Sequence, residues 1–409
     1  MPDTDPFSQL IAPFSRRGVD LGLERLQAAL AELGHPERRF AAVQVAGTNG
    51  KGSISTMLHA IAAAAGIRCG LYTSPHLLSW CERIRLPDGL IREAELQRLL
   101  QELQPLALRH NLTPFELVTA AAMQAFAAAG CELVVLEVGL GGRLDATTVH
   151  PDRQVLAFAS IGLDHTEHLG STLAAIAGEK AGVLHAGGLA VSGPQEPAAA
   201  QVLRQQAEQL GCPLRWVAPL PPPAEGGPVL GLRGDLQRLN AAVAAAAAEA
   251  LAERGWPITA TAIAAGLRQA RWPGRLDQRR FQGRPLLLDG AHNPPAATAL
   301  RQELDQNDRA NGTAQPRRWL IGMQRHKDAP ALLRTLLRPG DPVRVVRLPA
   351  EHSSWSAAEL EEATGHPMQA GDEDLRQQLA WLVDSPLLPV ACGSLYLVAE
   401  LLPLLEATD

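Results

Sequence analysis

The sequence predicts an α/β protein of two domains: a larger N-terminal domain with a P-loop and a mainly parallel sheet, and a smaller Rossmann-like C-terminal domain. Short apolar runs rich in β-branched residues alternate with longer runs rich in alanine and leucine, the pattern of a mainly parallel sheet. A glycine-rich turn that contains a lysine follows the first apolar run. The length of 409 residues corresponds to two or three domains at roughly 150 residues each.

The elements of the N-terminal domain follow from these runs in chain order. We expect strands at residues 40–47, 132–139 and 154–162. We expect helices at residues 54–66 and 114–130. Gly66 and Gly130 fit the ends of these helices and Pro114 fits the start of the second, because glycine favours the position after a helix and proline the first turn.

A second alternation of strands and helices defines the C-terminal domain. Its strand candidates are the runs PLLLDG, RRWLIGM, VRVVRLP and LPVACGS. The segment WPGR at residues 272–275 and the polar stretch that follows indicate a domain boundary. We therefore expect domains at residues 1–276 and 285–409, joined by a linker at residues 277–284.

Composition and charge exclude several classes of protein. The net charge of −6 is too weak and of the wrong sign for a nucleic-acid binder held by phosphate contacts. No apolar stretch reaches about 18 residues and no basic segment precedes an apolar core at the N-terminus, so we expect neither a membrane anchor nor a signal peptide. The five cysteines form no CxxC pair and have no metal-ligand spacing, which indicates reduced thiols in a cytoplasmic protein. No long heptad pattern is present, so a monomer is expected.

Lysine is rare in this chain. Only Lys51, Lys180 and Lys327 occur among the 37 lysine and arginine residues. A position that keeps lysine in such a chain can require a compact ammonium or a titratable amine. The three lysines are therefore candidates for specific chemistry.

The strongest local signal is VAGTNGKGS at residues 45–53, between a predicted strand and a predicted helix. Glycines allow a tight turn that points backbone N–H groups and the helix N-terminus at a phosphate, and a lysine adds a mobile charge. These positions are filled by Gly47, Gly50, Lys51 and Gly52. The pattern departs from a strict P-loop because Gly52 follows the lysine and the hydroxyl comes one residue later. The alternative is a glycine-rich turn without a ligand.

A phosphate loop of this kind needs a carboxylate at the end of a strand to hold magnesium. Glu137 lies near the end of the apolar run LVVLEVG, where a buried unpaired carboxylate would cost several kcal/mol. A metal or cation partner is therefore expected, and the alternative is an ion pair with Arg143. Asp145, in the following loop, is either a ligand-binding acid or a turn and cap residue.

Further polar groups follow a strand or lie in an apolar helix. The segment just after the strand at 154–162 carries Asp164, His165, Glu167 and His168. Such a position is typical of ligand sites, although each histidine alone can be structural. Lys180 lies in the apolar helix STLAAIAGEKAGV. It is either an ordinary lysine paired with a neighbouring group or a residue with special chemistry. Ser74, in LYTSPHLLSW, either points its hydroxyl at the phosphate and magnesium site or belongs to an ordinary loop.

In the C-terminal domain, the run LLLDGAHNPPA places Asp289, His292 and Asn293 after a strand. Polar groups at the carboxyl end of a strand indicate ligand contacts, with helix capping by Asn293 as the alternative. The residues alone thus predict a two-domain enzyme that uses ATP with magnesium.

The order of these motifs resembles the folylpolyglutamate synthase/dihydrofolate synthase family, which is related to the Mur ligases. The similar segments run from about residue 20 to residue 400. They are DLGLER, GTNGKGS, YTSPHL, PFELVT, LEVGLGGRLDATT, LDHTEHLG, GEKAGV, WPGRLD, LDGAHNP, GMQRHKD and GSLYLVAE. Such collinearity is more specific than any single motif.

The resemblance implies an ATP-dependent ligase of folate biosynthesis. The γ-phosphate of ATP would pass to a substrate carboxylate, and the amine of L-glutamate would displace phosphate from the acyl phosphate to form an amide. The substrate is dihydropteroate, a reduced folate, or both, and a bifunctional enzyme is the preferred hypothesis. The alternatives are a Mur-type amino-acid ligase, for which the 46 residues before Gly47 are too few to hold a separate UDP-binding domain, and a P-loop switch protein without ligase activity.

The resemblance also implies site residues. The phosphates of ATP would be bound by Thr48, Asn49, Gly50, Lys51, Gly52 and Ser53. Two magnesium ions would be held by Ser74, Glu137 and His165, and the rest of ATP would contact Asn240, Arg275, Asp289 and His292. Lys180 matches a lysine that the family carries as a carbamate. The expected catalytic residues are Lys51, Lys180 and His165.

The pteroyl substrate and glutamate would, by the same resemblance, contact a further set of residues. These are Asp20, Leu21, Gly22, Leu23, Phe115, Thr119, Arg143, Leu144, Asp145 and Ser394. The segment 191–231 is shorter than expected for the family, and Asp235 and Leu236 stand where an aromatic residue or a histidine is common. The departure at residues 235–236 lies just before Asn240 and therefore bears on the expected contact of Asn240 with the nucleotide.

Overall fold

The computed structural model describes residues 7–12, 20–310, 312, 316–349 and 353–407. The chain divides into two compact units, residues 1–231 with 237–271 and residues 232–236 with 272–409. Each unit has the predicted α/β fold around a sheet of its own. Among the described residues we find no helix with both the length and the apolar content that a membrane crossing requires.

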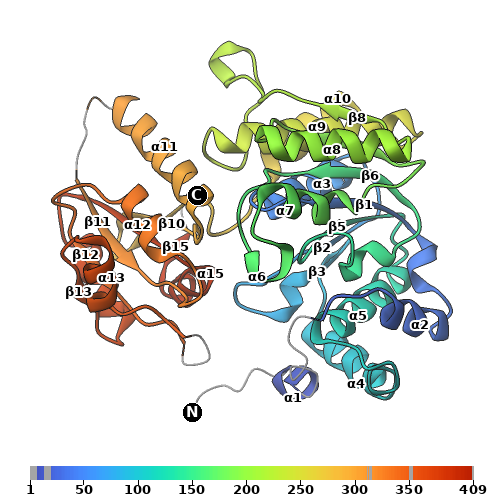
Figure 1. Ribbon diagram of the computed structural model, residues 1–409, viewed down its shortest axis with the longest axis horizontal. Coiled ribbons are helices and arrows are strands. Elements are labelled where there is room, and N and C mark those ends of the chain that lie inside the picture. The colour runs from blue at the N-terminus through green and yellow to red at the C-terminus, as the bar shows by residue number, and fades with distance from the viewer. Residues whose placement is uncertain (1–6, 13–19, 311, 313–315, 350–352, 408–409) are drawn as a thin grey trace. The chain divides into compact units, whose positions relative to one another are not determined.

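The N-terminal unit is built on an eight-stranded sheet in the order β4-β3-β2-β5-β1-β6-β7-β8 (Figure 1). Neighbouring strands from β2 to β8 are parallel, and the short strands β3 and β4 form an antiparallel edge. All residues of β1 and β5 are buried, as expected where helices cover both faces. The strands are β1 (Ala41–Ala46), β2 (Cys69–Tyr72), β3 (Ile84–Leu86), β4 (Gly89–Leu90), β5 (Leu133–Glu137), β6 (Arg153–Phe158), β7 (Leu189–Ser192) and β8 (Leu214–Trp216).

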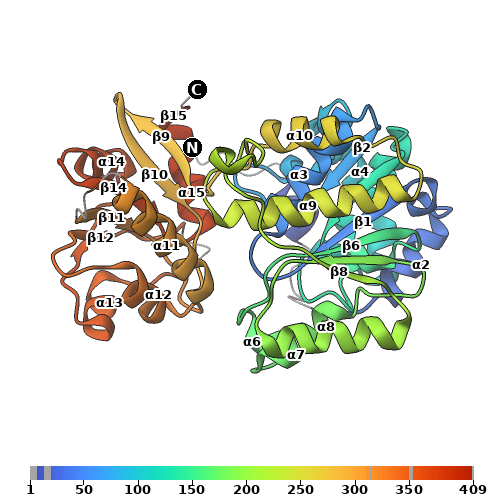
Figure 2. The ribbon, with the colours of Figure 1, turned by 90° about the horizontal axis from the view of Figure 1, so that it is seen from above.

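Helices cover both faces of this sheet. Figure 2 shows α9 and α10 on one side and α7 and α8 on the other. The helices are α1 (Ser8–Ile11), α2 (Glu24–Glu32), α3 (Lys51–Ala64), α4 (Glu93–His110), α5 (Pro114–Ala128), α6 (Thr166–Leu169), α7 (Leu173–Ala181), α8 (Pro197–Leu210), α9 (Leu236–Glu253) and α10 (Ala260–Gln269). Short 3₁₀ turns occur at η2 (Pro36–Arg39), η3 (Trp80–Arg83), η4 (Ala146–Val149) and η5 (Pro223–Glu225). Leu26 of α2, Leu100 of α4 and Leu117 of α5 share one apolar cluster with Val134 of β5.

The elements predicted for this unit are confirmed, with differences at their ends. The three predicted strands form β1, β5 and β6, and the helix expected at 114–130 forms α5. The helix expected at 54–66 begins at Lys51 instead. Its first turn is made by the lysine and glycine of the phosphate loop, and glycine is not a residue that signals a helix interior.

The C-terminal unit is built on a seven-stranded sheet in the order β13-β12-β11-β14-β10-β9-β15. The strands from β13 to β10 are parallel, whereas β9 and β15 add an antiparallel edge. The strands are β9 (Asp277–Phe281), β10 (Arg284–Asp289), β11 (Arg317–Ile321), β12 (Val343–Val345), β13 (Gln369–Ala370), β14 (Leu388–Cys392) and β15 (Glu406–Ala407). The helices are α11 (Pro294–Ala310), α12 (Ala329–Leu336), α13 (Ala357–Thr364), α14 (Leu375–Val383) and α15 (Leu395–Leu401), followed by η6 (Leu402–Leu404). The four predicted strand runs form β10, β11, β12 and β14.

The prediction of a linker at residues 277–284 is wrong. Residues Asp277–Phe281 form β9, which turns through Gln282 and Gly283 into β10. Along β9, exposed side chains alternate with half-buried ones up to Phe281, which is buried. Antiparallel strands of this kind face solvent on one side, so their sequences look polar and resemble a linker.

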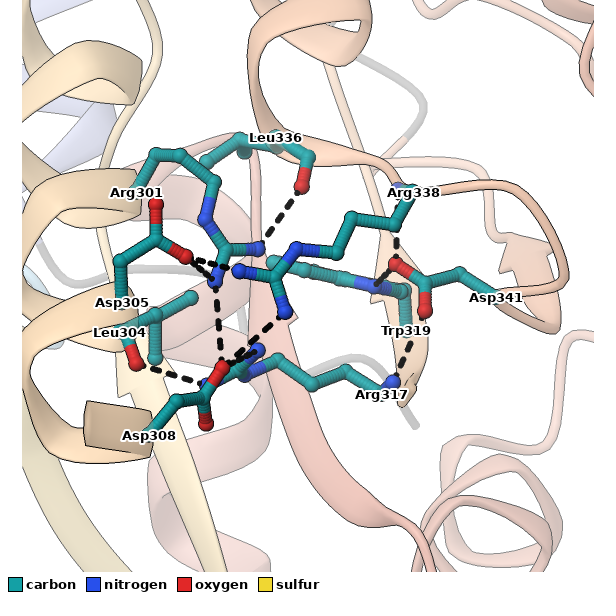
Figure 3. A network of polar contacts seen from close by, with 9 residues as sticks. All are labelled: Arg301, Leu304, Asp305, Asp308, Arg317, Trp319, Leu336, Arg338 and Asp341. Carbon is teal, nitrogen blue, oxygen red and sulfur yellow. Dashed lines mark hydrogen bonds and ion pairs between the residues drawn. The ribbon is translucent and has the colours of Figure 1, made fainter. Parts of the chain in front are cut away.

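A network of arginine and aspartate side chains joins α11, β11 and the loop before β12 (Figure 3). Arg317, which is 1% exposed, pairs with Asp308 at 2.7 Å. Arg338 contacts Asp308 at 3.0 Å, and Arg301 contacts Asp305 at 2.6 Å. Because the buried cation has a carboxylate partner, the network anchors α11 to the start of β11.

Candidate active site

The phosphate loop leaves the end of β1 and enters α3. Gly47 and Gly50 have positive φ values of 135° and 101°, a conformation that suits glycine. A Cβ atom on Gly47 would lie 2.7 Å from Cβ of Ala159, and one on Gly50 would lie 2.5 Å from Oδ1 of Asn240. The loop therefore packs so closely on the segment after β6 and on α9 that only glycine fits at these two positions.

Side chains pin the loop to the segment that follows β6. The hydroxyl of Thr48 donates to the carbonyl of Gly162 and accepts from its N–H, both at 3.1 Å. The hydroxyl of Ser160 donates to the carbonyl of Asn49 at 2.9 Å. The loop is thus held by hydrogen bonds of its own chain. The other predicted phosphate-binding residues, Gly52 and Ser53, lie in the first turn of α3.

Two lysines meet at the carbonyl oxygen of Gly47. Lys51 donates to this oxygen at 3.3 Å and to the carbonyl of Thr48 at 3.1 Å. Lys180, on α7, donates to it at 2.8 Å and is 5% exposed. Burial and the positive charge of Lys51 lower the pKa of Lys180 to about 7, although the carboxylates of Asp164 and Asp145 oppose the shift. The amine of Lys180 is therefore partly unprotonated near neutral pH.

Glu137 and Ser74, two of the residues predicted to hold magnesium, lie next to each other. Glu137 is the last residue of β5 and is 4% exposed. Its Oε2 accepts from the N–H of Ser74 at 3.4 Å. Arg143, the alternative partner, pairs instead with Glu179 at 2.8 Å. The partner observed for Arg143 is thus Glu179 and not Glu137. Serine and glutamate carry oxygen atoms of the kind that magnesium prefers.

His165 lies in the segment after β6 and has a positive φ of 50°. Its Nδ1 lies 3.8 Å from a carboxylate oxygen of Glu167, and its side chain is 41% exposed. In the part of the chain that the structure describes, no three His, Cys, Asp or Glu side chains are grouped as a metal site. The structure thus brings Ser74 to Glu137 and places His165 beside Glu167.

Phe115, Thr119 and Tyr72 form a wall beside the loop that follows β5. The ring centroids of Phe115 and Tyr72 are 5.9 Å apart, and a Cβ atom on Gly139 would lie 2.6 Å from Cζ of Phe115. The hydroxyl of Thr119 lies 2.9 Å from that of Tyr72 and 2.7 Å from the carbonyl of Phe115, and Thr119 is fully buried. Thr119 therefore supports the wall from behind, whereas Phe115 keeps part of its surface exposed.

Asp145 is held inside the loop after β5 and is 2% exposed. One carboxylate oxygen accepts from the N–H groups of residues 139–140 at 3.0 and 2.9 Å. The other accepts from the N–H and the hydroxyl of Thr147 at 3.0 and 2.6 Å. Burial raises the pKa of Asp145, although these hydrogen bonds oppose the shift. The turn and cap interpretation of Asp145 is thus observed, while its neighbours Arg143 and Leu144 keep exposed surface.

Residues 20–23 form neither helix nor strand and lead into α2. Asp20 is exposed and the next three residues are half-buried. The guanidinium of Arg25 contacts both Asp20 and Glu116 of α5. The structure therefore joins two of the predicted substrate-binding segments, residues 20–23 and the start of α5, through one arginine.

The C-terminal candidates lie after two neighbouring parallel strands, β10 and β14. Asp289 ends β10, in register with Cys392 of β14. Its carboxylate accepts from the N–H of Leu276 at 2.9 Å and from that of Ala291 at 2.8 Å. Burial raises the pKa of Asp289, and the positive charge of Arg275 opposes this shift. Asp289 thus lies close to Arg275, the other predicted nucleotide contact of this unit.

His292 and Ser394 follow these strands. The Nδ1 of His292 lies 2.8 Å from the carbonyl of Gly290. Ser394 caps the N-terminus of α15 and is 3% exposed. Asn293 accepts from the N–H of Ala296 at 2.9 Å, so the capping alternative for Asn293 is observed.

Known proteins are similar to this chain over most of its length. Residues 275–404 match the family model "Dihydrofolate synthetase, C-terminal domain". The chain is 32% identical to the dihydrofolate synthetase of Saccharomyces cerevisiae, over 94% of this chain and 97% of that protein. It belongs to the folylpolyglutamate synthase/dihydrofolate synthase family.

Solved structures of this family have the same fold. An Escherichia coli member in complex with DHPP and ADP has a TM-score of 0.84 and 29% identity, over 98% of this chain and 97% of that chain. A bifunctional folylpolyglutamate synthase/dihydrofolate synthase with Mn, AMPPNP and L-glutamate bound has a TM-score of 0.79 and 31% identity, over 98% of both chains. The family fold thus extends over both units.

Glu82 was not among the predicted site residues, although it shapes the segment that follows Ser74. Its carboxylate accepts from the N–H groups of Leu77, Leu78 and Ser79 at 2.8, 2.8 and 3.0 Å. Ser79 and Glu82 form a capping box at η3. The spacing Ser-x-x-Glu is the sequence signal of such a box and could have identified Glu82.

Gln237 was also absent from the prediction. Its Oε1 accepts from Nδ2 of Asn240 at 3.0 Å, and both side chains are 4% exposed. This bond orients the amide that packs on Gly50. A glutamine one turn before an asparagine on the same helix face is the only sequence signal for it.

Proposed function

We propose that this chain is an ATP-dependent ligase that joins L-glutamate to the carboxylate of dihydropteroate and to the γ-carboxylate of folylpolyglutamate. The observation that carries the proposal is the meeting of Lys51 and Lys180 at the Gly47 carbonyl, in a chain that matches a dihydrofolate synthetase over 94% of its length. The substrate carboxylate attacks the γ-phosphorus of ATP and releases ADP. The amine of glutamate then attacks the acyl phosphate carbon, inorganic phosphate leaves, and the amine loses a proton.

The phosphate loop stabilises the charge that develops on the transferred phosphate. Its N–H groups at the start of α3 and the ammonium of Lys51 are suited to bind phosphate oxygens. Thr48 and Ser160 already hold the loop by hydrogen bonds to its own chain. Dipoles held in place before the reaction stabilise a transition state without the cost of reorganisation.

Magnesium, when bound, offsets the negative charge of the phosphate oxygens. Ser74 and Glu137 fit this ion because they are a serine and a buried carboxylate whose residues are joined by the bond from the Ser74 N–H to Glu137. His165 adds a nitrogen donor on the segment after β6. A family member with Mn and AMPPNP bound supports a divalent cation, and two magnesium ions remain part of the proposal.

Lys180 reacts, in this proposal, with carbon dioxide to form a carbamate. An unprotonated amine attacks the carbon of CO₂ and loses a proton, so a buried cation becomes an anion next to the phosphate loop. The lowered pKa of about 7 supports this step because only the neutral amine is nucleophilic. Arginine lacks such an amine, which agrees with the retention of lysine here.

In this proposal each substrate is assigned to the residues predicted for it. The pteroyl group is assigned to residues 20–23, Phe115 and the loop that carries Arg143, Leu144 and Asp145, with Thr119 behind Phe115. The nucleotide is assigned to the phosphate loop, Asn240, Arg275, Asp289 and His292, and glutamate is assigned to Ser394. A relative solved with DHPP and ADP and another with L-glutamate support these ligands.

We further propose a cytoplasmic monomer. All five cysteines are free and buried, which suits a reducing compartment.

The test is a product assay with purified protein. ADP release is measured with ATP and magnesium, with and without L-glutamate, and with dihydropteroate or a tetrahydrofolate as the acceptor. Product masses should show dihydrofolate from dihydropteroate and the addition of one glutamate to tetrahydrofolate. ATP turnover that does not depend on glutamate would support a nucleotide switch, and turnover only with a peptidoglycan precursor would support a Mur-type ligase.

A further inference from the structure

Arg25 connects two segments that are distant in the sequence. It lies in the first turn of α2 and its side chain is 23% exposed. One Nη atom donates to the carbonyl of Asp20 at 2.6 Å, and the other lies 3.1 Å from the carboxylate of Asp20. Its Nε donates to Oε2 of Glu116 at 3.3 Å. The three nitrogens of one guanidinium thus face residues 20–23 on one side and α5 on the other.

Glu116 is a buried anion at the start of α5, with a side chain that is 4% exposed. Its Oε2 also accepts from the N–H of Thr113 at 2.7 Å, and the hydroxyl of Thr113 accepts from the N–H of Glu116 at 3.2 Å. This capping box fixes the carboxylate on the helix. Its second oxygen, Oε1, is buried without a hydrogen-bond partner among the described residues. Arg25 therefore supplies the countercharge that this buried carboxylate needs.

Residues 20–23 belong to no helix or strand, so contacts such as those of Arg25 help to hold their conformation. Apart from the bonds of Arg25, the N–H of Leu23 donates to Glu24 at 3.2 Å and the carbonyl of Leu23 accepts from the N–H of Gln27 at 2.9 Å. Phe115, next to Glu116, is packed against Gly139 and Tyr72. The pair of Arg25 and Glu116 thus sets the position of residues 20–23 relative to the ring of Phe115.

We propose that Arg25 is a positioning residue for acceptor binding, one that holds residues 20–23 against the start of α5 so that the enzyme captures dihydropteroate. This inference rests on the proposed function, which assigns residues 20–23 and Phe115 to the pteroyl group. Arg25 itself touches neither the phosphate loop nor the residues assigned to magnesium. Loss of its contacts weakens the capture of dihydropteroate and leaves the activation of ATP unchanged.

The test compares Arg25→Ala, Arg25→Lys and Glu116→Gln with the wild-type enzyme. For Arg25→Ala, the KM for dihydropteroate should rise about tenfold, as expected for the loss of charge-assisted hydrogen bonds, with kcat and the KM for ATP within about twofold of wild type. The KM of Arg25→Lys for dihydropteroate should lie between those of the wild type and Arg25→Ala, because lysine keeps the charge but cannot bridge three acceptors. Glu116→Gln keeps the cap acceptor and should raise the same KM, so the inference stays testable if Arg25→Ala does not fold.

The matched control is Arg98→Ala, which removes an exposed ion pair with Glu102 on α4. It should leave every KM unchanged. Three outcomes would overturn the inference. They are an equal rise in the KM for ATP and for dihydropteroate, a fall in kcat with an unchanged KM, and no effect of any variant. Absence of dihydrofolate from the wild-type reaction would instead overturn the proposed function, so the two failures are distinguishable.

Discussion

Lys51 and Lys180 donate to one carbonyl oxygen, that of Gly47, although they lie on different helices. Two ammonium groups at one acceptor repel each other, and the more buried of them loses its proton more easily. Burial, together with the positive charge of Lys51, lowers the pKa of Lys180 to about 7. A neutral amine at the base of a phosphate loop is a reactive group.

Lys180→Arg should lose most of its ligase activity and remain folded. The guanidinium keeps a positive charge but cannot take up carbon dioxide as the primary amine does. The measurement is kcat together with the melting temperature. Lys327→Arg is the matched control because Lys327 has no role in the proposed mechanism, and near-normal turnover of Lys180→Arg would refute the carbamate.

Activity should depend on bicarbonate and on pH in a defined direction. Below the pKa of about 7, Lys180 is an ammonium that cannot react with carbon dioxide, so the carbamate fraction and the rate should fall as the pH drops. Above it, the neutral amine is available and added bicarbonate should restore activity to enzyme kept free of carbon dioxide. Carbon-13 NMR with labelled bicarbonate should show a carbamate signal that Lys180→Arg lacks. A rate and spectrum that do not respond to bicarbonate would contradict the prediction.

Gly50→Ala should raise the KM for ATP by about tenfold or more, because an L side chain at φ 101° is strained and its Cβ would lie 2.5 Å from Asn240. Gly66→Ala is the control, since Gly66 also has a positive φ, of 77°, but no atom lies within 4 Å of its Cβ position. This control should lower the free energy of unfolding by about 1 kcal/mol and leave the KM for ATP unchanged. Equal effects of the two variants on ATP binding would argue against the packing of the loop on α9.

Arg317→Ala should destabilise the C-terminal unit by about 3–5 kcal/mol, because it leaves the carboxylate of Asp308 without its closest buried partner. Urea unfolding, followed by tryptophan fluorescence, measures this change, since Trp319 lies on the same strand. Arg98→Ala removes an exposed pair and should change the free energy of unfolding by less than about 0.5 kcal/mol. A similar small effect for Arg317→Ala would show that the network in Figure 3 contributes little to stability.

Much of the N-terminal fold could be predicted because its signals are local. The run that forms β1, the glycine loop and α3 follow one another within a short stretch, and each depends on nearby residues. The edges of both sheets could not be predicted in the same way. Strands β3, β4 and β9 are short or half exposed, so they lack the apolar run that predicts a buried strand.

The types of residue at the site could be predicted from the sequence, but the contacts between their side chains could not. The loop residues from Thr48 to Ser53 and the carboxylate of Glu137 stand where the sequence places them, next to the ends of strands. The sequence left open whether Asp145 binds a ligand or caps a turn, and whether Glu137 pairs with Arg143. The fold shows the contacts themselves, because it brings Thr147 to Asp145 and Glu179 to Arg143.

The sequence by itself determined the buried strands, the helices next to them and the position of the phosphate loop, because these depend on residues that are close along the chain. The order of the motifs along the chain indicated the family. The tertiary structure alone decided that Lys180 meets Lys51 and that Arg25 meets Glu116. The sheet order β5-β1-β6 places segments side by side that are far apart in the chain. Burial at those meeting points then changes the pKa of a lysine and makes a buried carboxylate depend on an arginine, and neither effect can be calculated from spacing along the sequence.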